Sequence, residues 1–330
     1  MRFLLRLFAL GVLIAVIGSM WLFYRLNQPY RGFSAPVFIE FARGTSTRDM
    51  AAALKQKGVI ADDWLFLAAR ALRRNQTLQA GEYKFDRPAS PLTVFGRIAR
   101  GDIFYMELLV PEGFNMFDVA EAVGKLGTMT PEAFLSAARN PSLIRDLDPE
   151  APSLEGYLFP NKYRVYRHTT AQQICRMMTD EFRARWQALG TKANVHRTVT
   201  LASMVEREAR RPEERPMVAS VFQNRLMIGM KLDCDPTTVY AALLEHRYRG
   251  TIYRSDLENM SPWNTYQHAG LPPGPIANPG LSSIQAALAP ADTRFLYFVA
   301  KADGSGGHNF SESLVQHEAA VSRYQRATRR

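Results

Sequence analysis

The chain has 330 residues, of which 47% are hydrophobic and 22% charged, and this composition excludes an intrinsically disordered protein. Its length allows two or three domains, and its formal net charge of +10 favours an acidic partner such as lipid headgroups or an anionic polymer. The basic residues are scattered along the sequence and not clustered, so we expect no nucleic-acid partner.

The amino terminus carries an uncharged run, residues 7–24, which is about the minimum length that crosses the hydrocarbon of a bilayer. The run ends in Trp21, Phe23 and Tyr24, which suit a membrane interface. A cleaved signal peptide is the alternative, but no small-x-small cleavage site follows the run. We therefore expect a transmembrane helix at 7–24, a cytoplasmic tip at 1–6 and the bulk of the chain outside the membrane.

A linker and a duplicated unit follow this segment. Residues 25–36 contain several Pro, Gly, Asn and Ser residues and predict a linker that lifts the folded part off the membrane. A strand at 37–41 with a helix at 49–56 is repeated by a strand at 106–110 with a helix at 114–125. The pairs that are identical at one constant offset are Gly44/Gly113, Asp49/Asp118, Ala51/Ala120, Ala53/Ala122 and Gly58/Gly127. We expect a small α+β module over residues 37–128.

The remaining elements predict a second α+β domain over residues 129–330. Between the two repeats we expect helices at 62–74 and 92–100 and a strand at 80–85. After residue 128 we expect helices at 131–145, 170–189, 199–209, 217–228 and 314–325, and strands at 163–166 and 295–299.

One helix of this second domain carries the main candidate for chemistry. Leu201, Met204 and Val205 form an apolar helix face, and the next position on that face is Glu208. A carboxyl group held against apolar neighbours has a raised pKa, which suits a general acid. Glu206 lies on the other flank of the helix. The alternative is that Glu208 pairs with one of the nearby arginines, which are Arg207, Arg210, Arg211 and Arg215.

A second carboxylate would be needed for a hydrolase, and Asp233 and Asp235 are the close candidates. Asp235, which precedes a proline, is equally typical of a helix N-cap. The Pro- and Gly-rich segment 270–280 is expected to line a sugar groove opposite Glu208, and a simple connector is its alternative. Asn264 and Tyr266 offer an amide and an aromatic face to sugars.

The sequence gives no reason to expect a metal or a cofactor, because no His pair has ligand spacing and no phosphate-binding glycine loop is present. Cys175 and Cys234 are expected to be unpaired buried thiols, with a disulfide between them as the alternative.

The carboxy-terminal part of the sequence carries a series of motifs, which begins with Ala-Ser-Met-Val-Glu-Arg-Glu at 202–208. The series continues at 218–226, 229–232, 235–237, 264–266, 270–276, 297–300 and 307–310. In this order the motifs resemble the MltG (YceG-like) family of endolytic murein transglycosylases. The amino-terminal anchor fits the family, and the module at 37–128 resembles a LysM-like wall-binding region. Cys234 is a departure, because the family does not call for a thiol there.

The resemblance implies a lytic enzyme of the inner membrane with a periplasmic catalytic domain. The catalytic glutamate of the family corresponds to Glu208 in this sequence. Glu208 would cut the bond between N-acetylmuramic acid and N-acetylglucosamine in nascent glycan strands. The cut would leave a 1,6-anhydro end. The resemblance also implies peptidoglycan synthases as partners and a role in terminating strand elongation. The substrate-binding candidates are Glu206, Asn224, Arg225, Asp235, Asn264, Tyr266, Gly274 and His308. The alternatives are a muramidase-type hydrolase using Glu208 with Asp233 or Asp235, and a non-enzymatic wall-binding scaffold.

Overall fold

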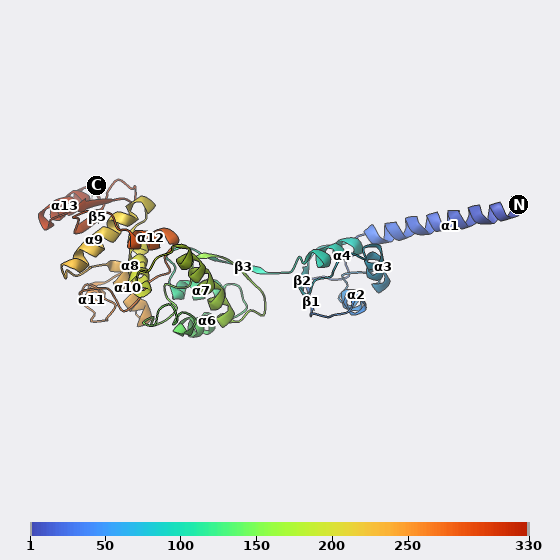
Figure 1. Ribbon diagram of the computed structural model, residues 1–330, viewed down its shortest axis with the longest axis horizontal. Helices are drawn as coiled ribbons and strands as arrows, with labels where there is room; N and C mark the ends of the chain where they lie inside the picture. Colours follow the sequence, from blue (N-terminus) through green and yellow to red (C-terminus); the bar gives the residue numbers. More distant parts are fainter. Residues whose placement is uncertain (1, 329–330) are drawn as a thin grey trace. The chain divides into compact units, whose positions relative to one another are not determined.

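The computed structural model describes residues 2–328 and divides into two compact units, one ending at Tyr105 and the other beginning at Met106 (Figure 1). Each unit combines helices with small antiparallel sheets, which confirms the predicted α+β class. The division corrects the predicted module of residues 37–128. The second repeat belongs to the second unit, because its strand β3 (Met106–Val110) pairs with β4 (Asn161–Val165).

Unit 1 is built on one antiparallel strand pair flanked by helices. Its elements are α1 (Arg2–Asn27), β1 (Val37–Phe41), α2 (Thr47–Gln56), α3 (Asp63–Leu72), β2 (Gly81–Phe85) and α4 (Pro91–Arg100). Residues alternate along each strand, so Ile39 lies opposite Tyr83 and both side chains point into the core. The order β1-α2-α3-β2 encloses this core, to which α4 adds Val94, Phe95 and Ile98.

Among residues 2–328, α1 is the one helix that is long and apolar enough to cross a membrane, and it fits a single-pass anchor. The predicted linker that follows it is not a free spacer. Tyr30 and Ala89 exchange backbone hydrogen bonds of 3.1 and 3.2 Å, and the Gly32 N–H donates to the Gly58 carbonyl at 2.8 Å. The segment that leaves α1 is therefore fastened to unit 1.

Unit 2 contains two further strand pairs and most of the helices. Besides β3 and β4, its strands are β5 (Tyr297–Ala300) and β6 (His308–Ser311), which pair with each other. Its helices are α5 (Met116–Gly124), α6 (Pro131–Ala138), α7 (Ala171–Ala188), α8 (Val195–Glu208), α9 (Arg215–Met227), α10 (Asp235–Leu244), α11 (Arg254–Leu257), α12 (Leu281–Leu288) and α13 (Leu314–Thr328), with 3-10 turns at Pro141–Leu143 and Pro212–Glu214.

Helix α8 is the central element of unit 2. Its start is capped by Asn194, whose side chain accepts a hydrogen bond from the Arg197 N–H, and every residue from 198 to 205 is buried. It packs against both α9 and α12 (Figure 1). A helix buried on all sides can hold its terminal side chain at a fixed position, and that side chain is Glu208.

Three local predictions differ from the structure. The helix predicted at 131–145 ends at Ala138, because Pro141 cannot continue it and begins a 3-10 turn instead. Helix α12 was not predicted. Strand β6 (residues 308–311), which pairs with β5, was not predicted either.

Candidate active site

Glu208 is the last residue of α8, and the chain turns to an extended conformation at Ala209. Its side chain reaches a cavity of about 400 Å³ in unit 2. The walls come from the start of α10, from β5 and α13, and from loops on either side. The lining residues are Glu208, Arg225, Leu232, Asp233, Asp235, Tyr266, Tyr297, Phe298, Leu314 and His317.

The side chain of Cys234 is the immediate neighbour of the Glu208 carboxyl group. The Cys234 thiol donates a hydrogen bond to Glu208 Oε1 at 3.2 Å, and no other hydrogen bond to that carboxyl group is found among residues 2–328. Thr265 and Thr237 hold the backbone of Cys234 through bonds of 3.1 and 2.7 Å. The thiol is therefore fixed against the carboxyl group.

The environment of Glu208 favours its protonated form. Burial raises the pKa of Glu208 to about 7, and the negative charge of Asp235 acts in the same direction. The Cys234 hydrogen bond and the Arg207 charge act in the opposite direction but do not outweigh burial. A carboxyl group with this pKa is partly protonated near neutral pH and can donate a proton to a bound substrate.

Asp235 is the first residue of α10 and not its cap, because Cys234 occupies the cap position without a side-chain bond. The Asp235 carboxylate instead faces the cavity, where it accepts a hydrogen bond of 2.6 Å from the Tyr266 hydroxyl group. The pair brings together two of the predicted site residues and places a negative charge beside Glu208.

Arg225 and Asp233 form the next part of the wall. The Arg225 guanidinium donates to the Leu232 carbonyl at 3.0 Å and lies 3.3 Å from Asp233 Oδ2. It also lies over the Tyr297 ring, 5.3 Å from the ring centre. Asp233 adopts a φ of 45°, a conformation that residues with a side chain rarely adopt and that is common near functional sites. Arg225 therefore braces the turn that presents Asp233 and Cys234.

Glu206 points away from the cavity, as the helix geometry predicted. Its carboxylate accepts bonds of 2.9 Å from Arg215 and 3.0 Å from the Gly280 N–H, and its side chain is buried. It does not line the cavity with Glu208. The structure thus gives Glu206 a part in joining α8 to α9 and to the start of α12.

Two other predicted binding residues are occupied by contacts within the fold. Asn224 donates to the carbonyls of Thr293 and Phe295, both at 2.9 Å. His308 pairs with Glu214 at 2.7 Å. Neither side chain lines the cavity beside Glu208.

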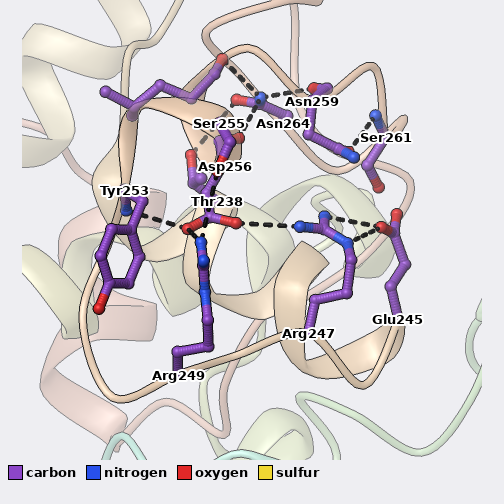
Figure 2. A network of polar contacts seen from close by, with 11 residues as sticks. Thr238, Glu245, Arg247, Arg249, Tyr253, Ser255, Asp256, Asn259, Ser261 and Asn264 are labelled. Atoms are coloured by element: carbon purple, nitrogen blue, oxygen red, sulfur yellow. Dashed lines mark hydrogen bonds and ion pairs between the residues drawn. The ribbon is translucent and has the colours of Figure 1, made fainter.

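Asn264 holds the loop that follows α10, as Figure 2 shows. Its buried amide group donates to the carbonyls of Asp256, Leu257 and Asn259, while Thr238 donates to its oxygen at 3.3 Å. In the same network Asp256 pairs with Arg247 and Arg249 at 2.9 and 3.2 Å (Figure 2). This network fixes the loop that carries Tyr266 to the cavity.

The Pro- and Gly-rich segment 270–280 does not line this cavity, contrary to the prediction. Gly274 is buried, and a Cβ atom there would lie 3.0 Å from the ring of Pro152. The Ile276 N–H donates to Ser203 on α8 at 3.0 Å. The segment is thus a packed brace behind α8, because Pro272, Gly274 and Pro275 are buried within unit 2.

Cys234, Tyr297 and His317 line or border the site and were not predicted as functional residues. The Tyr297 and His317 rings stack with their centres 5.1 Å apart, and His317 Nδ1 is buried without a partner among residues 2–328. The two rings come from β5 and α13, whose contact depends on tertiary structure. In the sequence, nothing indicated a functional role for these residues except the aromatic character of residue 297. The two cysteines are both free and buried.

The chain is similar to known proteins over nearly its whole length. The model of the YceG-like family matches residues 39–323. The endolytic murein transglycosylase of Bacillus subtilis is 30% identical over 332 aligned positions, which cover 94% of this chain and 91% of the relative. That of Streptococcus pneumoniae is 26% identical, and the match covers 80% of this chain and 54% of the longer relative. A crystal structure of a YceG-like protein from Listeria monocytogenes is 30% identical, with a TM-score of 0.56 over 87% of this chain and 99% of that chain. The chain belongs to the YceG-like family.

Proposed function

We propose that this chain is an endolytic murein transglycosylase, a lyase that cuts the glycan strands of peptidoglycan with Glu208 as its acid and base. The observation that carries the proposal is the buried Glu208 carboxyl group at a cavity lined by aromatic and charged side chains. Two relatives bear this name: the Bacillus subtilis protein matches nearly the whole chain, and the Streptococcus pneumoniae protein matches most of it.

The reaction needs one carboxyl group in two successive roles. Protonated Glu208 gives its proton to the oxygen between the muramic acid and glucosamine sugars, and the bond from that oxygen to C1 breaks. The Glu208 carboxylate then takes the proton from the muramyl 6-hydroxyl group as its oxygen bonds to C1. The product is a 1,6-anhydro sugar, and Glu208 is protonated again.

The carboxylates near Glu208 support this lytic course over hydrolysis. Asp235 accepts from Tyr266 and Asp233 lies beside Arg225, so each has a partner that holds it in place. A lytic reaction needs no second carboxylate to activate water, because the nucleophile belongs to the substrate. Burial is the main cause of the raised pKa of Glu208, and the negative charge of Asp235 adds to it.

The aromatic rings and the overall charge fit the substrate class. Tyr266, Tyr297 and Phe298 offer ring faces and edges to sugars, and Arg225 adds a positive charge at the wall. The net charge of +10 favours a polymer whose peptide stems carry carboxylates.

Unit 1 and α1 support a location at the site of wall synthesis. The strand–helix–helix–strand order of β1, α2, α3 and β2 supports a LysM-like, wall-binding role for unit 1. With α1 as the anchor, a cytoplasmic amino terminus puts both units on the outer, periplasmic face of the inner membrane. There the enzyme meets nascent strands and the synthases that make them, and its cuts end strand elongation.

The test compares two substitutions in the cavity, each assayed by mass spectrometry of fragments released from purified murein sacculi. We expect Glu208→Gln to lower the rate of anhydro-muropeptide release by about 10³-fold or more, because the amide cannot donate a proton. Asp235→Asn removes the negative charge that helps to raise the pKa of Glu208 but leaves the proton donor in place. We therefore expect this variant still to produce anhydro ends, at a reduced rate.

The same assay separates the other candidate functions. Reducing ends from the wild type, lost on Asp235→Asn, would show a muramidase with two catalytic carboxylates. No release by any form of the folded protein would show a wall-binding scaffold. Wild-type release that persists in Glu208→Gln would contradict the assignment of Glu208.

A further inference from the structure

The carboxyl end of α1 is part of the core of unit 1. Leu26 is 1% exposed and packs in the same cluster as Ile39, Phe41 and Phe66, with Leu22 beside it. The chain that follows is bonded to unit 1 at Tyr30 and Gly32. No flexible linker therefore separates the apolar helix α1 from the rest of unit 1.

A tryptophan of α3 lies directly on this helix. The rings of Trp21 and Trp64 stack with centres 5.8 Å apart and an angle of 9° between their planes. Both remain open to the surroundings, with exposed fractions of 52% and 37%. Trp64 lies at the start of α3, which Figure 1 shows at the end of unit 1 that faces α1.

The charges around these rings are paired. Arg25 lies 5.6 Å from the centre of the Trp21 ring and 3.3 Å from Asp62, and Lys55 lies 3.8 and 3.7 Å from Asp62 and Asp63. Paired charges around an exposed aromatic pair cost less to bring into a headgroup layer than isolated ones, because each ion retains its partner.

The position of Trp21 along α1 determines how deep Trp64 would lie in a bilayer that α1 spans. The uncharged run of α1 ends at Tyr24, and a helix rises 1.5 Å per residue, so Trp21 lies about 5 Å before that end. Tryptophan prefers the boundary between acyl chains and headgroups. A ring stacked on Trp21 occupies that same layer when α1 spans a bilayer.

We propose that unit 1 is itself a membrane-contacting body, with Trp64 and the start of α3 set into the interfacial layer of a phospholipid bilayer beside α1. This inference rests on the proposed role of α1 as a membrane span, and it does not depend on the catalytic assignment. Unit 1 then contacts the membrane through two elements, α1 and the start of α3, so its attachment does not depend on α1 alone.

The test uses the full chain in phosphatidylcholine–phosphatidylglycerol vesicles with Trp64 as the single tryptophan. The substitutions Trp21→Phe, Trp186→Phe and Trp263→Phe leave Trp64 as the reporter and keep an aromatic ring against it. Fluorescence is quenched from the lipid side by phospholipids brominated near the headgroup and from the water side by acrylamide. The matched control adds Phe104→Trp and Trp64→Phe, which moves the reporter to a ring that packs on Phe38 of β1.

We expect shallow brominated lipids to quench Trp64 several times more strongly than the control tryptophan, and acrylamide to do the reverse. Trp64 quenched by acrylamide and not by lipid, in protein that floats with the vesicles, would overturn the contact while leaving the anchor intact. Protein that does not float with vesicles would overturn the anchor and the contact together. Murein cleavage by the same samples is measured separately, so failure of the catalytic proposal remains distinguishable.

Discussion

Burial favours the protonated form of Glu208, and one weak hydrogen-bond donor, the Cys234 thiol, opposes it. The Cys234 thiol is 3.2 Å from Glu208 Oε1, and a thiol stabilises a carboxylate less than a hydroxyl group does. Burial therefore prevails and raises the pKa of Glu208 to about 7. The charged groups that act on it are Asp235 at the start of α10 and Arg207, the preceding residue of α8.

Substitution of Cys234 is expected to move the pH profile of cleavage in opposite directions. The rate should fall as pH rises through the pKa of Glu208, because only the protonated form starts the reaction. Cys234→Ser supplies a stronger donor to the carboxylate, lowers the pKa and moves this fall to lower pH. Cys234→Ala removes the donor and moves it to higher pH.

The measurement is kcat/KM for murein fragments against pH, with Cys175→Ala as the control because Cys175 is buried in a different core of unit 2. A purely structural role for Cys234 would change the height of the profile and leave its midpoint unmoved in both variants. That result would show that the Cys234 thiol does not set the pKa of Glu208.

At the scale of elements, the segment 270–280 acts as a brace whose key contact is Asn278. The Asn278 side-chain oxygen accepts from the N–H groups of Gly156 and Leu158, both at 2.9 Å. Its amide group donates to Glu155 Oε1 at 3.0 Å and to the Phe114 carbonyl at 2.8 Å. One buried side chain thus joins three segments that are far apart in the sequence.

We expect Asn278→Ala to lower the free energy of unfolding of unit 2 by about 4 kcal/mol, because it leaves several buried polar groups without partners. The measurement is urea unfolding followed by circular dichroism. Asn224→Ala is a suitable comparison, since it removes side-chain bonds to two backbone carbonyls at a position that is less buried. A change of less than about 1 kcal/mol in Asn278→Ala would show that water replaces the lost bonds.

The sequence predicted the elements that depend on a local pattern. The predictions failed where a segment's role depends on contacts with residues far away in the sequence. The face of α8 indicated the opposed directions of Glu206 and Glu208, because helical periodicity alone determines them. The role of 270–280 depends on Asn278 meeting Glu155 and Gly156, which periodicity cannot reveal. The boundary near residue 128 failed for the same reason, since the repeat is local but the pairing of β3 with β4 is not.

At the scale of the whole molecule, α1 has two roles that a truncation series can separate. Its amino-terminal part is exposed and apolar, whereas Leu26 lies in the core of unit 1. Removing residues 1–20 should release a water-soluble protein with a stable unit 1. Removing residues 1–27 also deletes Leu26, and we expect this to cost unit 1 about 3 kcal/mol.

Thermal melting and amide hydrogen exchange of the two truncated proteins make the comparison. Protection of β1 and β2 should fall in the shorter protein only, while protection of α8 stays the same in both. Equal protection of β1 and β2 in both proteins would show that Leu26 adds nothing to unit 1.

In the proposed reaction the nucleophile comes from the substrate and not from water. The most direct measurement is digestion of purified glycan strands by the full-length protein in water enriched in heavy oxygen, followed by mass spectrometry of the new ends. We predict anhydro-muramyl ends that carry no heavy oxygen. Muramyl reducing ends that carry the label would contradict the lytic reaction and show a hydrolase.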